Sequence, residues 1–201
     1  MWVPIALSCD VPEGVTRAVI LEGAEYVVWR GAGGTAQVWE DRCPHRGMRL
    51  SFGFVRGDAL NCLYHGWEYG LAASCHRIPA HPDLVVPPSI KAKAFAVAEA
   101  GGMIWTRMAG GDAMPELPKA LPVASLAIDA TPETLLAVCA AAPQGEAQIF
   151  AAVLDGIVFH LGWHSVSAGK IMLHAASPMA DPGALPALRA LRDQAEMRQA
   201  A

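Results

Sequence analysis

Four residues that can bind a metal stand in two short motifs in the first third of the chain. Cys43 and His45 lie in Cys-Pro-His-Arg-Gly, and Cys62 and His65 lie in Cys-Leu-Tyr-His-Gly-Trp; residues 46–61 separate His45 from Cys62. Each motif offers one thiolate and one imidazole, so the two motifs together supply a Cys₂His₂ set. Such a set can hold a structural zinc ion, or a [2Fe–2S] cluster in which two Cys bind one iron and two His bind the other.

The order of these residues favours the cluster over zinc. Zinc fingers usually group like with like, as two Cys followed by two His, whereas each motif here pairs a Cys with a His. A set of core residues without any metal is the third alternative, and it is less favoured still. Gly47 and Gly66 follow the two histidines closely, where a loop that wraps a cluster must turn tightly and glycine adopts a positive φ cheaply.

The residues around both motifs resemble the Rieske oxygenase family. The first motif is preceded by Glu-Asp-Arg and followed by Leu-Ser-x-Gly (residues 50–53), and the second contains Tyr-His-Gly-Trp. Farther along, Cys-x-x-Ile-Pro-Ala-His-Pro (75–82) and Glu-x-x-Gly-x-Ile-Trp (99–105) are similar to the vanillate O-demethylase-like branch. The resemblance covers residues 2–105 and implies a Rieske domain of small antiparallel sheets with the cluster at its tip.

The resemblance also implies the ligands and the chemistry. Cys43 and Cys62 would hold the inner iron, and His45 and His65 the outer iron, of a Rieske [2Fe–2S] cluster that transfers one electron. Respiratory Rieske proteins carry an extra, disulfide-bonded Cys in each cluster loop, and neither loop has one here. Neutral His ligands give potentials of about −150 to +300 mV. Because no disulfide or polar hydroxyl shell is evident, we expect the lower end of that range.

The partners implied are a ferredoxin or flavin reductase as electron donor, a catalytic oxygenase subunit, and an oligomeric assembly. Four arginines crowd the cluster loops of a chain with net charge −4: Arg42, Arg46, Arg49 and Arg56. They could form a basic rim that steers an acidic electron donor toward the cluster. The alternative is that they cap loop carbonyls.

Composition excludes several other classes of protein. Hydrophobic residues make up 53% of the chain, and 19 Gly and 15 Pro suit a protein of short strands and turns. The acidic balance argues against general nucleic-acid binding. We expect no signal peptide, because the N-terminus lacks a charged region and a long apolar run, and no membrane span, because no uninterrupted apolar stretch reaches 18 residues. Three further cysteines, an odd number, suit a reducing cytoplasm: Cys9, Cys75 and Cys139.

The chain is expected to be mainly β. Alternating or β-branched runs predict strands over residues 2–7, 17–21, 26–30, 37–40, 95–99 and 102–105, with a hairpin turn at 56–58. A stretch rich in Pro and Gly, about 109–122, predicts a linker. We therefore expect a Rieske-type antiparallel β domain over 1–112 and a shortened β-rich (α+β) domain over 113–201, ending in a helix.

The second half offers two clear elements. Residues 157–164 alternate apolar and polar side chains, which predicts a strand with His160 and His164 on one face. Asp181 followed by Pro182 predicts the start of a helix running to about residue 199, with Leu185 and Leu188 inward. Its surface pairs would be Arg189–Asp193 and Arg192–Glu196.

Asp155, His160 and His164 invite a second interpretation. Two His and one carboxylate hold mononuclear Fe(II) in non-haem oxygenases, and the family that the chain resembles has such a site after its Rieske domain. The spacing departs from that family's pattern, and either Asp181 or Glu196 would have to serve as the carboxylate usually found farther along. The strand interpretation is therefore preferred. His76, His81 and His174 are expected to be structural or exposed.

Three functions follow from these alternatives. The preferred one is one-electron transfer by a component, or a shortened oxygenase subunit, of a Rieske-type oxygenase system. The second is a complete small oxygenase with a mononuclear iron, acting on an aromatic or methylated substrate. The third is a structural Rieske subunit of a hetero-oligomer. Iron content and co-purifying chains distinguish them.

Overall fold

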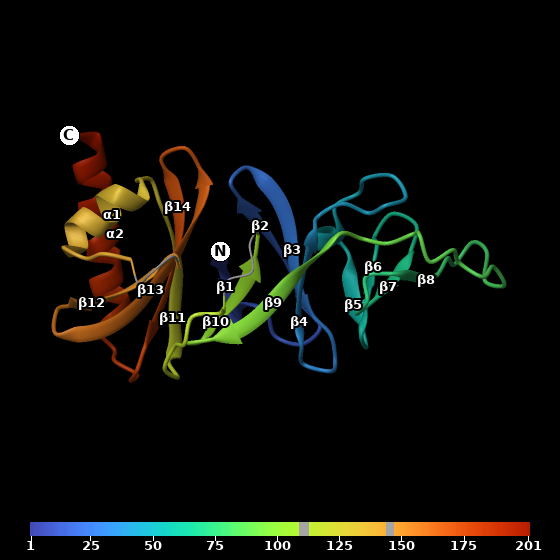
Figure 1. Ribbon diagram of the computed structural model, residues 1–201, viewed down its shortest axis with the longest axis horizontal. Coiled ribbons are helices and arrows are strands. Elements are labelled where there is room, and N and C mark those ends of the chain that lie inside the picture. The colour runs from blue at the N-terminus through green and yellow to red at the C-terminus, as the bar shows by residue number, and fades with distance from the viewer. Residues whose placement is uncertain (109–112, 144–146) are drawn as a thin grey trace. The chain divides into compact units, whose positions relative to one another are not determined.

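The computed structural model describes residues 1–108, 113–143 and 147–201 of the chain (Figure 1). Contacts divide the chain into two compact units. The N-terminal unit comprises Asp10–Ile20 and Ala24–Val97, and the C-terminal unit comprises Met1–Cys9, Leu21–Gly23 and Ala98–Ala201. The predicted boundary near residue 112 lies outside the described residues. The compact units are not two consecutive segments, because the first nine residues belong with the second half of the chain.

The N-terminal unit contains two antiparallel arrays of strands. In the first, β2 (Thr16–Leu21), β3 (Ala24–Arg30) and β4 (Ala36–Glu40) are neighbours, and β4 also pairs with the start of β9 (Ala94–Ala100). Trp29 and Trp39 project from β3 and β4 into the core, with ring centroids 4.9 Å apart in an edge-to-face contact. Aromatic and β-branched residues thus form the strands that the sequence predicts at these positions.

The second array is a small four-stranded sheet, and the loop between its two middle strands is the second Cys/His motif. Its order is β5 (Phe54–Arg56), β6 (Ala59–Asn61), β7 (Glu68–Gly70) and β8 (Cys75–Arg77). The predicted hairpin is confirmed, since β5 and β6 join through Gly57 at a φ of 55°. The chain between β6 and β7 is the motif that contains Cys62 and His65.

The C-terminal unit is built around a second four-stranded sheet. The strands β11 (Leu121–Ile128), β12 (Ile149–Leu154), β13 (Ile157–Ser167) and β14 (Lys170–Ser177) are antiparallel in the order β11-β14-β13-β12. One face packs on the helices α1 (Pro132–Cys139) and α2 (Ala184–Ala200), as Figure 1 shows. The other face packs on the antiparallel pair β1 (Trp2–Leu7) and β10 (Met103–Arg107).

The predicted strand with period two is confirmed in β13. Phe159, Leu161 and Trp163 are buried in the core between the sheet and the helices. The opposite face of β13 is covered as well: a Cβ at Gly162 would meet Pro4 of β1 and Met103 of β10. His164, expected on a polar strand face, is therefore fully buried.

The helices differ in detail from the prediction. The terminal helix begins at Ala184, because the Asp181 carboxylate accepts a hydrogen bond from the Gly183 amide in the preceding turn (2.7 Å). Leu188 is buried as expected, whereas Leu185 is 37% exposed. Arg192 forms an ion pair with its neighbour Asp193, which raises the pKa of Arg192, and the predicted partner Glu196 contributes to the same shift. Helix α1 was not predicted. No helix among the described residues is long and apolar enough to cross a membrane.

Candidate functional site

The two Cys/His motifs form two loops of the same local structure. In the first, the amide of Cys43 donates to the carbonyl of Met48 and the amide of Gly47 donates to that of Cys43, both at 2.8 Å. In the second, the Cys62 amide donates to Trp67 (3.0 Å) and the Gly66 amide to Cys62 (2.9 Å). Gly47 and Gly66 have φ values of 70° and 68°, so the expected positive φ is present at both turns.

The two thiols lie at the buried end of the loops. Cys43 and Cys62 are 3% and 2% exposed and share one hydrophobic cluster with Cys75 and Tyr69. Burial raises the pKa of the Cys62 thiol, while backbone hydrogen bonds of Tyr64 and His65 lower it and the adjacent Cys43 raises it further. The Tyr69 hydroxyl lies 3.1 Å from Cys43 Sγ. The sulfurs are thus close together in an apolar setting with one polar neighbour.

The two imidazoles lie together at the outer end. The ring centroids of His45 and His65 are 4.7 Å apart, and the His45 ring stacks on Trp67 at 4.3 Å with an interplanar angle of 8°. His45 is half-buried and His65 is exposed. Desolvation lowers the pKa of His45, with smaller contributions from His65 and Arg46. The neutral imidazole that a metal ligand requires is therefore favoured here.

The donor set fits a binuclear cluster better than a single ion. Among the residues that the structure describes, no three or more His, Cys, Asp or Glu side chains converge on a point where one metal ion could sit. A structural zinc would need all four ligands around one centre. Two buried thiols in one pair and two imidazoles in another are instead what a [2Fe–2S] cluster with mixed ligands requires.

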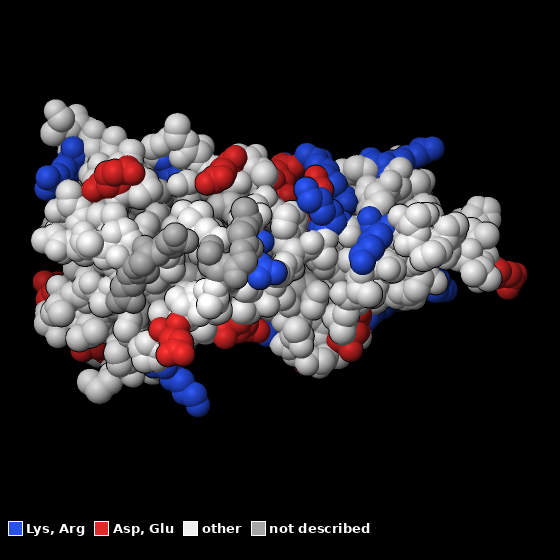
Figure 2. All heavy atoms as spheres, in the orientation of Figure 1, with Lys and Arg blue, Asp and Glu red and all other residues white. Residues whose placement is uncertain are grey.

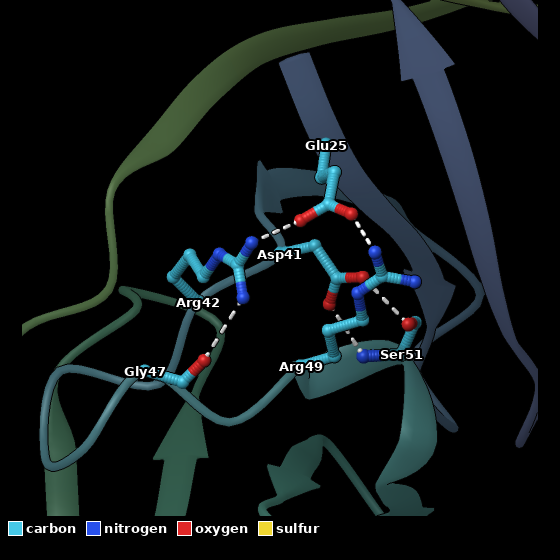
Figure 3. A network of polar contacts seen from close by, with 6 residues as sticks. All are labelled: Glu25, Asp41, Arg42, Gly47, Arg49 and Ser51. Atoms are coloured by element: carbon cyan, nitrogen blue, oxygen red, sulfur yellow. Dashed lines mark hydrogen bonds and ion pairs between the residues drawn. The ribbon is translucent and has the colours of Figure 1, made fainter. Parts of the chain in front are cut away.

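Three of the four arginines near the loops make different contacts. Arg42 and Arg49 both form ion pairs with Glu25, and Arg42 also donates to the carbonyl of Gly47 (Figure 3). Arg56 lies over the ring of Phe54 at 5.0 Å. For Arg42 the structure therefore shows the carbonyl-capping alternative. Figure 2 shows acidic and basic side chains interspersed over the face in view.

Asp155, His160 and His164 do not form a metal site in the described part of the chain. Asp155 is exposed in the turn between β12 and β13, with a φ of 49°. His164 Nδ1 instead lies 3.0 Å from the carbonyl oxygen of Pro4 and 3.2 Å from Nε2 of His174.

The remaining histidines follow the sequence interpretation. His174 is buried and structural, and its Nδ1 is 2.9 Å from the Ser125 hydroxyl. His76 and His81 are exposed. The hydrogen-bonded series Ser125–His174–His164–Pro4 was not predicted, because these residues meet only when the strands pair in the folded sheet.

Comparison with known proteins agrees with this geometry. Residues 1–91 match the Rieske [2Fe-2S] domain family. Oxidoreductase NdmD of Pseudomonas putida is 41% identical over 108 residues, which are 53% of this chain and 18% of that protein. The 3-chlorobenzoate-3,4-dioxygenase oxygenase subunit of Comamonas testosteroni is 32% identical over 120 residues, 59% of this chain and 28% of that protein. The chain thus spans less than a third of these relatives.

Solved structures show the same fold over nearly the whole chain. Pseudomonas putida CBB5 NdmA superposes with a TM-score of 0.70 at 20% identity, covering 98% of this chain and 78% of that one. Dicamba monooxygenase bound to dicamba gives a TM-score of 0.77 at 15% identity, covering 100% and 85%. The two loops, the paired donors and the sequence match lead to one conclusion: residues 1–91 are a Rieske [2Fe–2S] domain, homologous to that of Rieske oxygenase alpha subunits.

Proposed function

We propose that this chain transfers single electrons within a Rieske oxygenase system, with Cys43, Cys62, His45 and His65 as the cluster ligands. The observation that carries the proposal is the separation of the donors, with the two thiols buried and the two imidazoles together near the surface. When bound, the cluster supplies a site that accepts and releases one electron. The rest of the chemistry depends on how the protein surrounds it.

The protein shields one end of the site and opens the other. Cys43 and Cys62 are packed among Leu50, Leu60 and Tyr69, all of them fully buried, which keeps water away from the sulfurs. His65 is exposed, so its outer ring edge is where an electron enters or leaves over the shortest distance to a partner. The stacked Trp67 holds the His45 ring beside it.

The surface around His65 suits a protein partner. Leu63 and Tyr64 in the same loop are 58% and 52% exposed, and the centroid of the Tyr64 ring lies 3.9 Å from that of His65. Exposed apolar side chains of this kind, rimmed by polar ones, mark interaction sites. We assign this surface to a ferredoxin or flavin reductase as electron donor, and to a catalytic oxygenase subunit as acceptor.

Iron content and the effect of ligand substitutions test the proposal. The purified chain should contain about two irons and two acid-labile sulfides, and His45→Ala or His65→Ala should remove the spectrum of the Rieske cluster. The matched control is His76→Ala, an exposed histidine in the same unit, which should change nothing. A colourless protein that contains one zinc ion would refute the proposal.

The same measurement tests the alternative of a complete small oxygenase. That function needs a third iron per chain, held by two His and a carboxylate. A ratio of about three irons that falls to two in His160→Ala/His164→Ala would establish it and replace the electron-transfer proposal. No arrangement among the described residues favours it at present.

A further inference from the structure

Asp41 is a buried carboxylate at the entrance of the first cluster loop. It is 1% exposed and lies two residues before Cys43. Both of its oxygens accept hydrogen bonds from one residue at the far end of the loop: Oδ1 from the Ser51 amide (2.7 Å) and Oδ2 from the Ser51 hydroxyl (2.6 Å). A charged group loses hydration energy when it is buried, so a position like this persists only where its oxygens are satisfied.

The contact between Asp41 and Ser51 closes the loop across ten positions (Figure 3). Cys43 and His45 lie between these two residues. Ser51 is itself anchored, since its carbonyl accepts a hydrogen bond from the Thr16 hydroxyl at 2.9 Å. The Asp41 amide donates to the Glu25 carbonyl at 2.9 Å, which fixes the other end of the loop to β3. Both ends of the loop are therefore tied to the sheet and to each other.

A second set of contacts braces the middle of the same loop. The Glu25 carboxylate pairs with Arg42 through one oxygen and with Arg49 through the other, as Figure 3 shows. Arg42 also reaches the Gly47 carbonyl at 3.2 Å. These side chains are partly exposed, so their contribution is screened by solvent. The buried contact between Asp41 and Ser51 is the one expected to dominate.

We propose that Asp41 and Ser51 are positioning residues that fix the first loop so that Cys43 and His45 meet the second loop in a geometry ready for the cluster. This inference rests on the proposed function, because it assigns the role of a latch to two residues that touch neither iron nor partner. Groups behind the ligands usually orient them and tune the metal centre. Ligand loops held by such contacts lose less entropy when the cluster forms.

Hydrogen exchange of the full-length protein as purified tests the latch directly. The amides of Cys43 and Gly47 are bonded inside the loop, so they exchange only when the loop opens. Ser51→Ala should raise their exchange rates at least about tenfold, and Asp41→Asn should have a similar effect. Ser51→Ala keeps the backbone amide of residue 51 and removes only the hydroxyl, so it remains informative even if Asp41→Asn does not fold.

The matched control is Asp58→Asn. Asp58 also anchors a loop of the same unit, by accepting a hydrogen bond from the Gly33 amide at 2.8 Å, and this bond involves neither end of the first cluster loop. It should leave the exchange of Cys43 and Gly47 unchanged. The double variant Asp41→Asn/Ser51→Ala should be no worse than the more affected single variant, because both substitutions act on the same side-chain hydrogen bond, between Oδ2 of Asp41 and the Ser51 hydroxyl.

A readout on the loaded protein separates positioning from general stability. The reduced cluster in Ser51→Ala should show shifted or broadened g values in electron paramagnetic resonance, whereas Asp58→Asn should match the wild type. The latch is refuted if Ser51→Ala and Asp41→Asn leave both the loop exchange and the g values unchanged, or if Asp58→Asn changes them equally. A wild-type protein without a Rieske signal would refute the proposed function instead, and the exchange rates would still report on the latch.

Discussion

Tyr69 is the residue that most changes the chemistry expected of the cluster. From the sequence we expected no hydroxyl near the ligands, yet its phenol oxygen lies 3.1 Å from Cys43 Sγ. Burial raises the pKa of Tyr69 strongly, and its hydrogen bond with Cys43 raises it further. The phenol therefore stays protonated, and it would donate a hydrogen bond to Cys43 Sγ if that sulfur binds iron as proposed.

Substituting Tyr69 by Phe should lower the reduction potential. Hydrogen bonds to cluster sulfurs stabilise the more negative, reduced state. A net hydrogen-bond energy of about 0.5–1.5 kcal/mol corresponds to roughly 20–65 mV for one electron. Redox titration of Tyr69→Phe measures the change, and Tyr64→Phe, whose residue is exposed in the second loop, is the control. An unchanged or higher potential in Tyr69→Phe would contradict donation to the cluster.

The proposed ligands follow from spacing in the sequence, whereas the residues that support their loops do not. Cys43, His45, Cys62 and His65 stand in motifs so specific that order along the chain suffices to find them. Asp41 and Ser51 stand in the flanks that carry the family resemblance, and Tyr69 follows the second motif, but the sequence does not indicate which contacts their side chains make. Their roles depend on loop ends and sheet strands that meet only in the folded protein.

At the scale of single elements, β13 joins the two halves of the C-terminal unit's core. His164 lies on the face of β13 opposite the helices, where its Nδ1 is hydrogen-bonded to the Pro4 carbonyl of β1. His174 of β14 is hydrogen-bonded to His164 in turn. His164→Ala should therefore cost about 2–4 kcal/mol of unfolding free energy, from a cavity and an unsatisfied carbonyl. His160→Ala, on the same face but only half-buried, should cost less than about 1 kcal/mol.

Chemical denaturation of both variants measures these costs. Which variant loses more unfolding free energy is the sensitive result, because both carry the same substitution on the same face of one strand. Equal, small losses would mean that His164 is not held in the buried series. A loss in His160→Ala that exceeds the loss in His164→Ala would contradict the packing of β13 on β1.

The buried histidines also predict how stability depends on pH. Burial lowers the pKa of His174 well below its usual value, and the neighbouring His164 lowers it further. The unfolded chain then binds a proton near pH 6.5 that the folded chain does not. Stability should be complete above about pH 7 and fall by up to about 1.4 kcal/mol per pH unit below about 6.5.

Unfolding measured between pH 7.5 and 5 checks this dependence. His174→Gln carries no titratable ring, so its stability should fall less steeply over the same interval. Parallel curves for the two proteins would show that His174 does not control the acid sensitivity.

The elements themselves were predictable where one signal dominates. The alternation in β13 is one example, and the β-branched and aromatic runs of β3 and β4 are others. Helix α1 was missed, although Thr131, Pro132 and Glu133 form a standard helix start: the Thr131 side chain accepts a hydrogen bond from the Thr134 amide, and Pro132 occupies the first turn. The apolar residues that follow, at positions 135–139, made this helix start less evident in the sequence.

At the scale of the whole molecule, the division of the chain could not be predicted. Residues 1–9 join a unit made mostly of residues beyond 98, since β1 pairs with β10 and covers one face of the C-terminal sheet. The paired segments are about a hundred residues apart in the chain, and neither contains a sequence pattern that indicates its partner. The stretch around 115–122, expected to be a linker, already contains the start of β11.

Electron transfer by the proposed Rieske cluster requires two imidazoles bound to one of its irons. Pulsed electron paramagnetic resonance of the dithionite-reduced protein detects ligand nitrogens by their hyperfine coupling. We predict hyperfine couplings from two strongly coupled histidine nitrogens. When the histidines are labelled with ¹⁵N, both ¹⁴N couplings should disappear and the corresponding ¹⁵N couplings should take their place. A reduced cluster with no strongly coupled nitrogen, or a protein with no paramagnetic signal and one bound zinc, would contradict ligation by His45 and His65.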